Sequence, residues 1–135
     1  MESIEIALDT SSAQIVDLTR EATRFCEGRG DGLLQVFAPH ATCGLALMET
    51  GSGSEADLAS LLNSLIPRDR AYRHSHGSKG HGADHLLPAI VSPSVTVPVF
   101  EGRMALGTWQ SIVCVDTNPD NPRRSVRLSF LGSVD

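Results

Sequence analysis

The chain has 135 residues, of which 41% are hydrophobic and 20% are charged, and its formal charge is -5 at pH 7. This composition is typical of a single soluble domain, which we assign to residues 1–135. The acidic balance argues against a general affinity for nucleic acid, and the longest apolar runs are far shorter than the ~20 residues that a membrane span needs. Three widely spaced cysteines and the lack of a visible signal peptide predict a cytoplasmic protein.

The first part of the sequence predicts two strands followed by a helix. Apolar and polar residues alternate over residues 4–9, which is the pattern of a half-buried strand. Residues 14–16 can return as a short second strand. The apolar spacing from Leu18 to Cys26 is helical, and the glycines that follow mark the end of this helix.

The middle of the chain predicts an extended region and a second helix. Residues 33–38 form a compact apolar run, and after Pro39 the chain continues extended over residues 40–49. Residues 54–66 carry leucines at the i, i+3, i+4 and i+7 positions of an amphipathic helix, and Pro67 stops it. We expect these leucines to lie in the core.

The last part of the sequence predicts a hairpin and a closing strand. Residues 83–91 indicate only a brief helical turn, broken at Pro88. Residues 94–100 and 104–116 have the pattern of a hairpin, and residues 123–131 form a final strand. The sum is about seven strands and two substantial helices, so the predicted class is α+β with largely antiparallel pairing.

The predicted strand over residues 106–116 has no polar face. Leu106 and Ile112 lie on one side of it, and Trp109 and Val113 lie on the other. A strand of this kind is buried on both faces, which a chain this short struggles to achieve alone. We therefore expect the chain to associate into an oligomer.

Four of the five histidines lie in one glycine-rich stretch between Tyr72 and residue 85: His74, His76, His81 and His85. Imidazole can exchange a proton, bind a metal or pair with phosphate near neutral pH, so such clustering indicates function. Functional groups must be held in place, and glycines let the centre of a loop swing. We therefore expect His74 and His85 to be functional and the two histidines between them to be incidental.

One run in the second half of the chain is highly specific: Leu-Gly-Thr-Trp-Gln, which follows Gly102-Arg103. It occurs together with His40-Ala41-Thr42-Cys43, Glu49, Asp57, Pro67, Tyr72, His74 and His85. In these residues, and over nearly its whole length, the chain resembles the YjbQ-like family. The resemblance implies a fold of two β-sheets that forms a homotrimer around a threefold axis. It also implies a secondary thiamine-phosphate synthase activity of some members, which joins a pyrimidine diphosphate to a thiazole phosphate and releases pyrophosphate.

Candidate site residues follow from the resemblance and from the strand pattern. The candidate catalytic residues are His40, His74, His85 and Glu49, and the candidate substrate-binding residues are Thr42, Thr108, Gln110 and Arg124. Thr108 and Gln110 share one strand face, and Arg124 is in line with a core face, where it needs an anion or an internal carboxylate. On an uninterrupted strand His40 and Glu49 would lie about 30 Å apart on opposite faces. They can meet only through a bulge or from different subunits.

Two function classes remain open. His40, His74 and His85 could hold zinc with an open coordination position, or they could act without metal as acid, base and phosphate donors. The first class is a thiamine-phosphate synthase-like transferase that acts on a small phosphorylated metabolite. The second is a non-catalytic trimer that binds a metabolite or a metal. Neither nucleic acid nor a membrane is an expected partner.

Overall fold

The computed structural model describes residues 1–133 and confirms the α+β class, with three helices and eight strands within this range. The sequence predicted one strand and one helix fewer. None of the described helices has the length and hydropathy that crossing a membrane requires. The elements in chain order are β1 Glu2–Asp9, β2 Ile15–Asp17, α1 Thr19–Cys26, β3 Gly32–Phe37, β4 Cys43–Met48, α2 Ser54–Leu65, α3 His81–Ile90, β5 Ser94–Phe100, β6 Arg103–Met104, β7 Ser111–Asp116 and β8 Arg123–Gly132.

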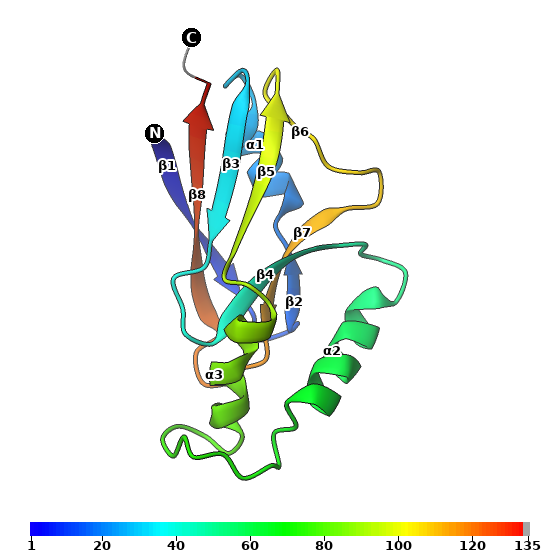
Figure 1. The fold of residues 1–135 in the computed structure, drawn as a ribbon, viewed down its shortest axis with the longest axis vertical. Helices are drawn as coiled ribbons and strands as arrows, with labels where there is room; N and C mark the ends of the chain where they lie inside the picture. Colours follow the sequence, from blue (N-terminus) through cyan, green and yellow to red (C-terminus); the bar gives the residue numbers. More distant parts are fainter. Residues whose placement is uncertain (134–135) are drawn as a thin grey trace.

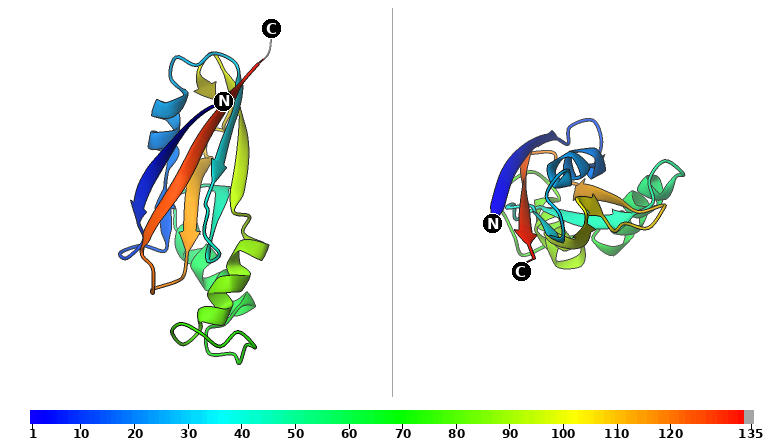
Figure 2. Two further views of the ribbon diagram at one scale, coloured as in Figure 1. Left: turned by 90° about the vertical axis from the view of Figure 1, so that its left-hand side faces the viewer. Right: turned by 90° about the horizontal axis from the view of Figure 1, so that it is seen from above.

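The strands form two antiparallel sheets, as the resemblance implied. The larger sheet has the order β1-β8-β3-β5-β6, and the smaller has the order β2-β7-β4. Figures 1 and 2 show the larger sheet in the upper part of the molecule and α2 and α3 below it. Apolar side chains from both sheets and from α1 pack together in the main core, among them Phe25, Leu34, Leu45, Ile112 and Leu128.

Strand β7 is buried on both faces, which confirms the two-sided pattern of its sequence. Ile112 belongs to the core between the sheets, whereas Val113 packs on the opposite face, with Leu62 of α2 and Leu87 of α3. The two helices therefore cover within one chain the face that was expected to need a partner subunit. For this reason the composition of β7 no longer argues for an oligomer.

The apolar run over residues 33–38 and the extended stretch after Pro39 form two strands, β3 and β4, and these lie in different sheets. β3 pairs with β5 and β8, whereas β4 pairs with β7. The turn between them forms because Pro39 has no amide proton and the amide of His40 donates to the carbonyl of Ala38 at 2.9 Å. His40 is therefore in a connection rather than on a strand, and the strand geometry expected for His40 and Glu49 does not apply.

The prediction that the leucines of α2 lie in the core was wrong for two of them. Leu62 is buried and Leu58 packs beside it, but Leu61 and Leu65 are more than half exposed, because only one face of α2 packs on the rest of the chain.

Two further sequence predictions were wrong in their element boundaries. Thr108, Trp109 and Gln110 do not lie on a strand but in the exposed connection between β6 and β7, where the Oε1 of Gln110 accepts a hydrogen bond from the amide of Gly107 at 2.8 Å. The segment around Pro88 is not a brief turn but the full helix α3. Contacts of its buried face with β7 stabilise this helix, so tertiary packing outweighs the local cost of the proline.

Candidate functional site

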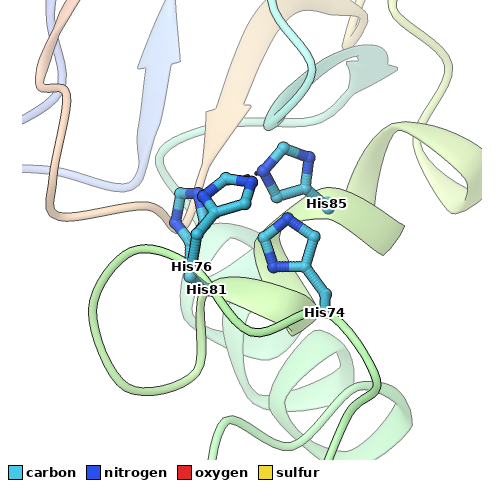
Figure 3. Close-up of side chains that lie close together, drawn as sticks. All are labelled: His74, His76, His81 and His85. Atoms are coloured by element: carbon cyan, nitrogen blue, oxygen red, sulfur yellow. Dashed lines mark hydrogen bonds between the residues drawn. The ribbon is translucent and has the colours of Figure 1, made fainter.

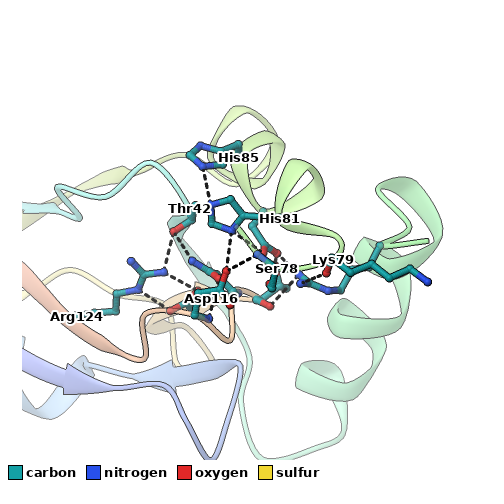
Figure 4. Close-up of polar contacts among 12 residues, drawn as sticks. Thr42, Ser78, Lys79, His81, His85, Asp116 and Arg124 are labelled. Carbon is teal, nitrogen blue, oxygen red and sulfur yellow. Dashed lines mark hydrogen bonds and ion pairs between the residues drawn. The ribbon is translucent and has the colours of Figure 1, made fainter. Parts of the chain in front are cut away.

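A pocket of about 460 Å³ opens where the β3–β4 connection, the start of α3 and the start of β8 meet. Its walls carry both imidazole and guanidinium groups, together with short polar and small side chains. The lining residues are Pro39, His40, Ala41, Thr42, His76, His81, His85, Asn121, Arg123 and Arg124. Two groups of polar residues thus face one cavity, and Figure 4 draws representatives of both.

The first group is a cluster of four histidines, which we call the histidine cluster: His74, His76, His81 and His85. One ring nitrogen from each lies within 4.8 Å of those of the other three (Figure 3). The ring centroids of His74 and His85 are 4.2 Å apart, and Nε2 of His81 lies 3.0 Å from Nε2 of His85. This arrangement brings together four ring nitrogens, each of a type that can bind a metal ion.

The glycines of this stretch allow close packing rather than free movement. An ideal Cβ on Gly77, whose φ is +82°, would lie 2.5 Å from the ring of His81, and one on Gly82 would lie 2.6 Å from Cβ of Tyr72. Such distances are far shorter than ordinary contacts, so only glycine fits. His81, expected in the swinging centre of a loop, is instead the first residue of α3 and is 7% exposed.

Carboxylates lie behind His81 on the side away from the cluster. Nδ1 of His81 is 3.3 Å from Oδ2 of Asp120 and 3.7 Å from Oδ2 of Asp84. Asp120 also accepts a hydrogen bond from the amide of Ser78 at 3.1 Å, and this bond holds the pKa of Asp120 below its usual range. Asp84 is fully buried and forms an ion pair with Arg68. The carboxylates therefore lie on the Nδ1 side of His81, and its Nε2 faces His85.

Two members of the histidine cluster, His74 and His85, favour the uncharged form. Loss of solvent lowers the pKa of His74, and so do the neighbouring rings of His76 and His81. The same causes lower the pKa of His85, with Asp84 acting weakly in the opposite direction. A neutral imidazole has a free nitrogen lone pair, which is the form that binds a metal or accepts a proton.

The second group is built around Arg124, at the start of β8. Its Nε and Nη2 donate to the two carboxylate oxygens of Asp116 at 2.7 and 3.1 Å, and Nη2 also donates to the hydroxyl of Thr42 at 2.7 Å. Burial acts to lower the pKa of Arg124, but the bonds to Asp116 prevail and raise it. Arg124 thus has the internal carboxylate partner that was the alternative to an anionic ligand, and it still lines the pocket.

His40 is at the same pocket but not in the histidine cluster. Its Nε2 lies 2.9 Å from the carbonyl oxygen and 3.1 Å from the amide nitrogen of Ser125, so the backbone of β8 fixes this ring. The structure therefore brings His74 and His85 together, as expected, but it does not add His40 to them. His76 and His81 take that place in the cluster.

Four candidate residues do not line the pocket: His74 belongs to a neighbouring pocket of about 230 Å³, and the other three are farther away. Glu49 is exposed beyond the end of β4, and Thr108 and Gln110 are exposed in the β6–β7 connection. Thr42 and Arg124 do line the pocket, together with Arg123. One signal would have revealed His81: it precedes His85 by one helical turn, so the two rings share a face if α3 starts at His81.

Similar proteins place the chain in a family. The profile of the family described as UPF0047 protein YjbQ-like matches residues 3–133. A UPF0047 protein of Mycobacterium tuberculosis is 61% identical over 131 residues, which cover 97% of this chain and 98% of that protein. The crystal structure of the hypothetical protein APE1520 from Aeropyrum pernix K1 is 31% identical, with a TM-score of 0.87 over 98% of this chain and 100% of that chain.

A second solved structure supports the fold alone. It is a YbjQ-like protein from Sulfolobus solfataricus P2, with a TM-score of 0.89 at 23% identity over 98% of this chain and 97% of that chain. The family match spans both sheets, all three helices and every residue that lines the pocket. The chain therefore belongs to the YjbQ-like family.

Proposed function

We propose that this protein is an enzyme that binds a small phosphorylated metabolite in the pocket, with thiamine phosphate formation as the reaction to test first. The observation that carries the proposal is that two arginines and His40 line the same cavity of about 460 Å³ as three members of the histidine cluster. The cavity is large enough for a small metabolite. Its charged lining suits an anion rather than an apolar ligand.

The arginine side of the pocket provides the phosphate contacts. Asp116 occupies Nε and Nη2 of Arg124, and among the described residues Nη1 has no hydrogen-bond partner. Arg123 is exposed and lines the pocket beside it. Guanidinium groups bind phosphate oxygens through charge-assisted hydrogen bonds, and a group already held in place loses little entropy when it does so. Arg124 would then provide a fixed contact and Arg123 an adaptable one.

These contacts suit the implied reaction. The thiazole nitrogen forms a bond to the methylene carbon of the pyrimidine, and the bond from that carbon to the diphosphate oxygen breaks. The diphosphate leaves with the bonding electrons, so negative charge develops on the leaving oxygen. Donors placed where charge develops stabilise the transition state, which is the role we assign to Arg123 and Arg124. His40, fixed by the backbone of Ser125, can donate a hydrogen bond or a proton to the same anion.

Product formation from the two thiamine precursors tests this proposal. We expect the wild-type protein to form thiamine phosphate and His40→Ala to lose about tenfold or more of kcat/KM, because a positioned acid or hydrogen-bond donor is removed. Thr108→Ala is the matched control, since Thr108 is exposed and away from the pocket. Binding of both precursors without any product would favour the alternative, a non-catalytic metabolite-binding protein.

The homotrimer is part of the same proposal. The resemblance implies it, and large apolar side chains are exposed on neighbouring elements: Leu47 on β4, Leu61 and Leu65 on α2, and Leu86 and Ile90 on α3. Several exposed large apolar side chains on neighbouring elements suit an interface. Sedimentation at micromolar concentration should show three copies, whereas a species of 14.4 kDa would contradict the trimer.

A cytoplasmic location also belongs to the proposal, because all three cysteines are buried and unpaired, as suits a reducing compartment.

A further inference from the structure

The chemical roles proposed above belong to His40, Arg123 and Arg124 and leave the histidine cluster without one. One ring nitrogen from each of His74, His76, His81 and His85 lies within 4.8 Å of the other three. Four imidazoles brought this close need either shared protons or a common ligand. The only hydrogen bond between rings in the described part of the chain joins His81 and His85, at 3.0 Å. Hydrogen bonding within the cluster therefore does not account for it.

Several polar atoms in and around the cluster lack partners. Nδ1 of His74, Nδ1 of His81 and Oδ2 of Asp84 are buried without a hydrogen-bond partner among the described residues. Such atoms cost free energy unless something binds them. Each of the four rings also offers one nitrogen to a common point, so a single central ligand would contact all four rings at once.

The charges around the cluster favour a cation over an anion as that ligand. Oδ2 of Asp120 lies 3.3 Å from Nδ1 of His81, and Oδ2 of Asp84 lies 3.7 Å from it. A carboxylate behind the distal nitrogen of a histidine is the usual support for a metal ligand, because it fixes the ring and increases the basicity of the other nitrogen. A phosphate at the same place would be repelled by these carboxylates.

We propose that His74, His76, His81 and His85 together bind one divalent transition-metal ion, zinc by preference, in a closed site with no open coordination position. Tetrahedral zinc with Zn–N bonds of about 2.0–2.1 Å separates its ligand nitrogens by about 3.4 Å. The nitrogens of His81 and His85 are already 3.0 Å apart, and no separation in the cluster exceeds 4.8 Å. Closing the site requires the rings to rotate, and the ring of His76 is exposed.

A closed site has a structural role. Sites in which the protein supplies all four ligands are usually structural, whereas catalytic zinc keeps a position for water or substrate. The ion would join the connection before α3 to the first turns of that helix. Through Asp120 it would also hold the loop between β7 and β8, which leads directly into Arg123 and Arg124. The metal would thus fix one wall of the pocket without acting on the substrate.

Metal binding by the untagged protein tests this inference without any substrate, so its result does not depend on the proposed reaction. We expect one zinc ion per chain after dialysis, and a higher melting temperature when zinc chloride is added to chelator-treated protein. His76→Ala and His81→Ala should each weaken zinc binding by at least about tenfold, although sequence alone set both residues aside. His40→Ala is the matched control, because it changes the one histidine outside the cluster and should leave zinc binding unchanged.

Substitution with cobalt distinguishes a closed site from an open one. Four-coordinate cobalt absorbs visible light much more strongly than six-coordinate cobalt. We expect a strong spectrum in the wild type that stays unchanged when imidazole or azide is added, since a closed site has no position for either. The inference is overturned if zinc binds no more tightly to the wild type than to His81→Ala, if His40→Ala weakens binding equally, or if added azide changes the cobalt spectrum. Circular dichroism on each variant verifies that the fold persists, and His76→Ala, at an exposed position, remains informative if His81→Ala fails to fold.

Discussion

At one end of the pocket Arg124 gives two hydrogen bonds to Asp116, whereas at the other end four histidines share one hydrogen bond among themselves. Both ends hold polar groups that are wholly or partly buried, but only the first is compensated within the chain. A buried group that already has its partner contributes stability and geometry, and one that has none indicates a ligand. By this criterion Arg124 and Asp116 shape the pocket, whereas the histidines are available to bind a ligand.

The largest effect is expected from breaking the compensated end. Asp116→Ala would leave the guanidinium of Arg124 buried without its carboxylate, and we expect a loss of about 3–5 kcal/mol in the free energy of unfolding. Urea denaturation measures this loss. The control is Glu5→Ala, which breaks the exposed pair of Glu5 and Arg127 at 3.1 Å and should cost less than about 1 kcal/mol. Equal losses in the two variants would show that Arg124 does not depend on Asp116.

The uncompensated end should respond through ligand affinity rather than through the stability of the metal-free protein. Asp120→Ala removes the carboxylate behind His81, and we expect zinc affinity to fall by about 10–100-fold because the ring is no longer oriented. Competition with a chromophoric chelator measures the affinity. Asp69→Ala is the control, since Asp69 is exposed and has no such contact with a histidine among the described residues. An unchanged zinc affinity in Asp120→Ala would show that the carboxylate of Asp120 does not support metal binding by His81.

The smallest effect is expected from Arg123, which is exposed at the mouth of the pocket. Arg123→Gln should weaken the binding of inorganic pyrophosphate by up to about fivefold, equivalent to about 1 kcal/mol, and high salt should reduce the difference. Calorimetric titration at low and high salt measures both. Arg127 lies on the same strand but pairs with Glu5 and does not line the pocket. The Arg127→Gln variant should therefore bind inorganic pyrophosphate as tightly as the wild type does. A similar loss in both variants would indicate a general charge effect.

The sequence predicted the elements whose apolar spacing is regular and misplaced those decided by distant contacts. The two-sided pattern of Ile112 and Val113 correctly indicated a strand buried on both faces. It could not show that α2 and α3 cover the second face, because that depends on where the chain returns. The same limit applies to Pro88, where local preference predicted a break and packing of α3 on β7 maintains the helix.

For the site, the sequence identified the histidine-rich stretch but not how its members divide. His76 and His81 were set aside because glycines surround them, yet Gly77 is where the ring of His81 packs against the backbone. The spacing of residues along the chain does not distinguish a glycine that makes the backbone flexible from a glycine that lets a neighbouring side chain pack closely against the backbone. Arg124 was recognised as a residue in need of a partner, but Asp116 lies on another strand and could not be identified from spacing.

The loop between β7 and β8 touches both ends of the pocket. Asp120 contacts His81, Asn118 donates to the hydroxyl of Thr42 at 3.3 Å, and Arg123 follows at the start of β8. If both ligands bind as proposed, they compete or cooperate through this one segment. Thermodynamic linkage then requires reciprocity: whatever factor zinc applies to the affinity for the phosphorylated metabolite, the metabolite applies to the affinity for zinc. The occupancy of the metal site in a cell would therefore depend on the concentration of that metabolite.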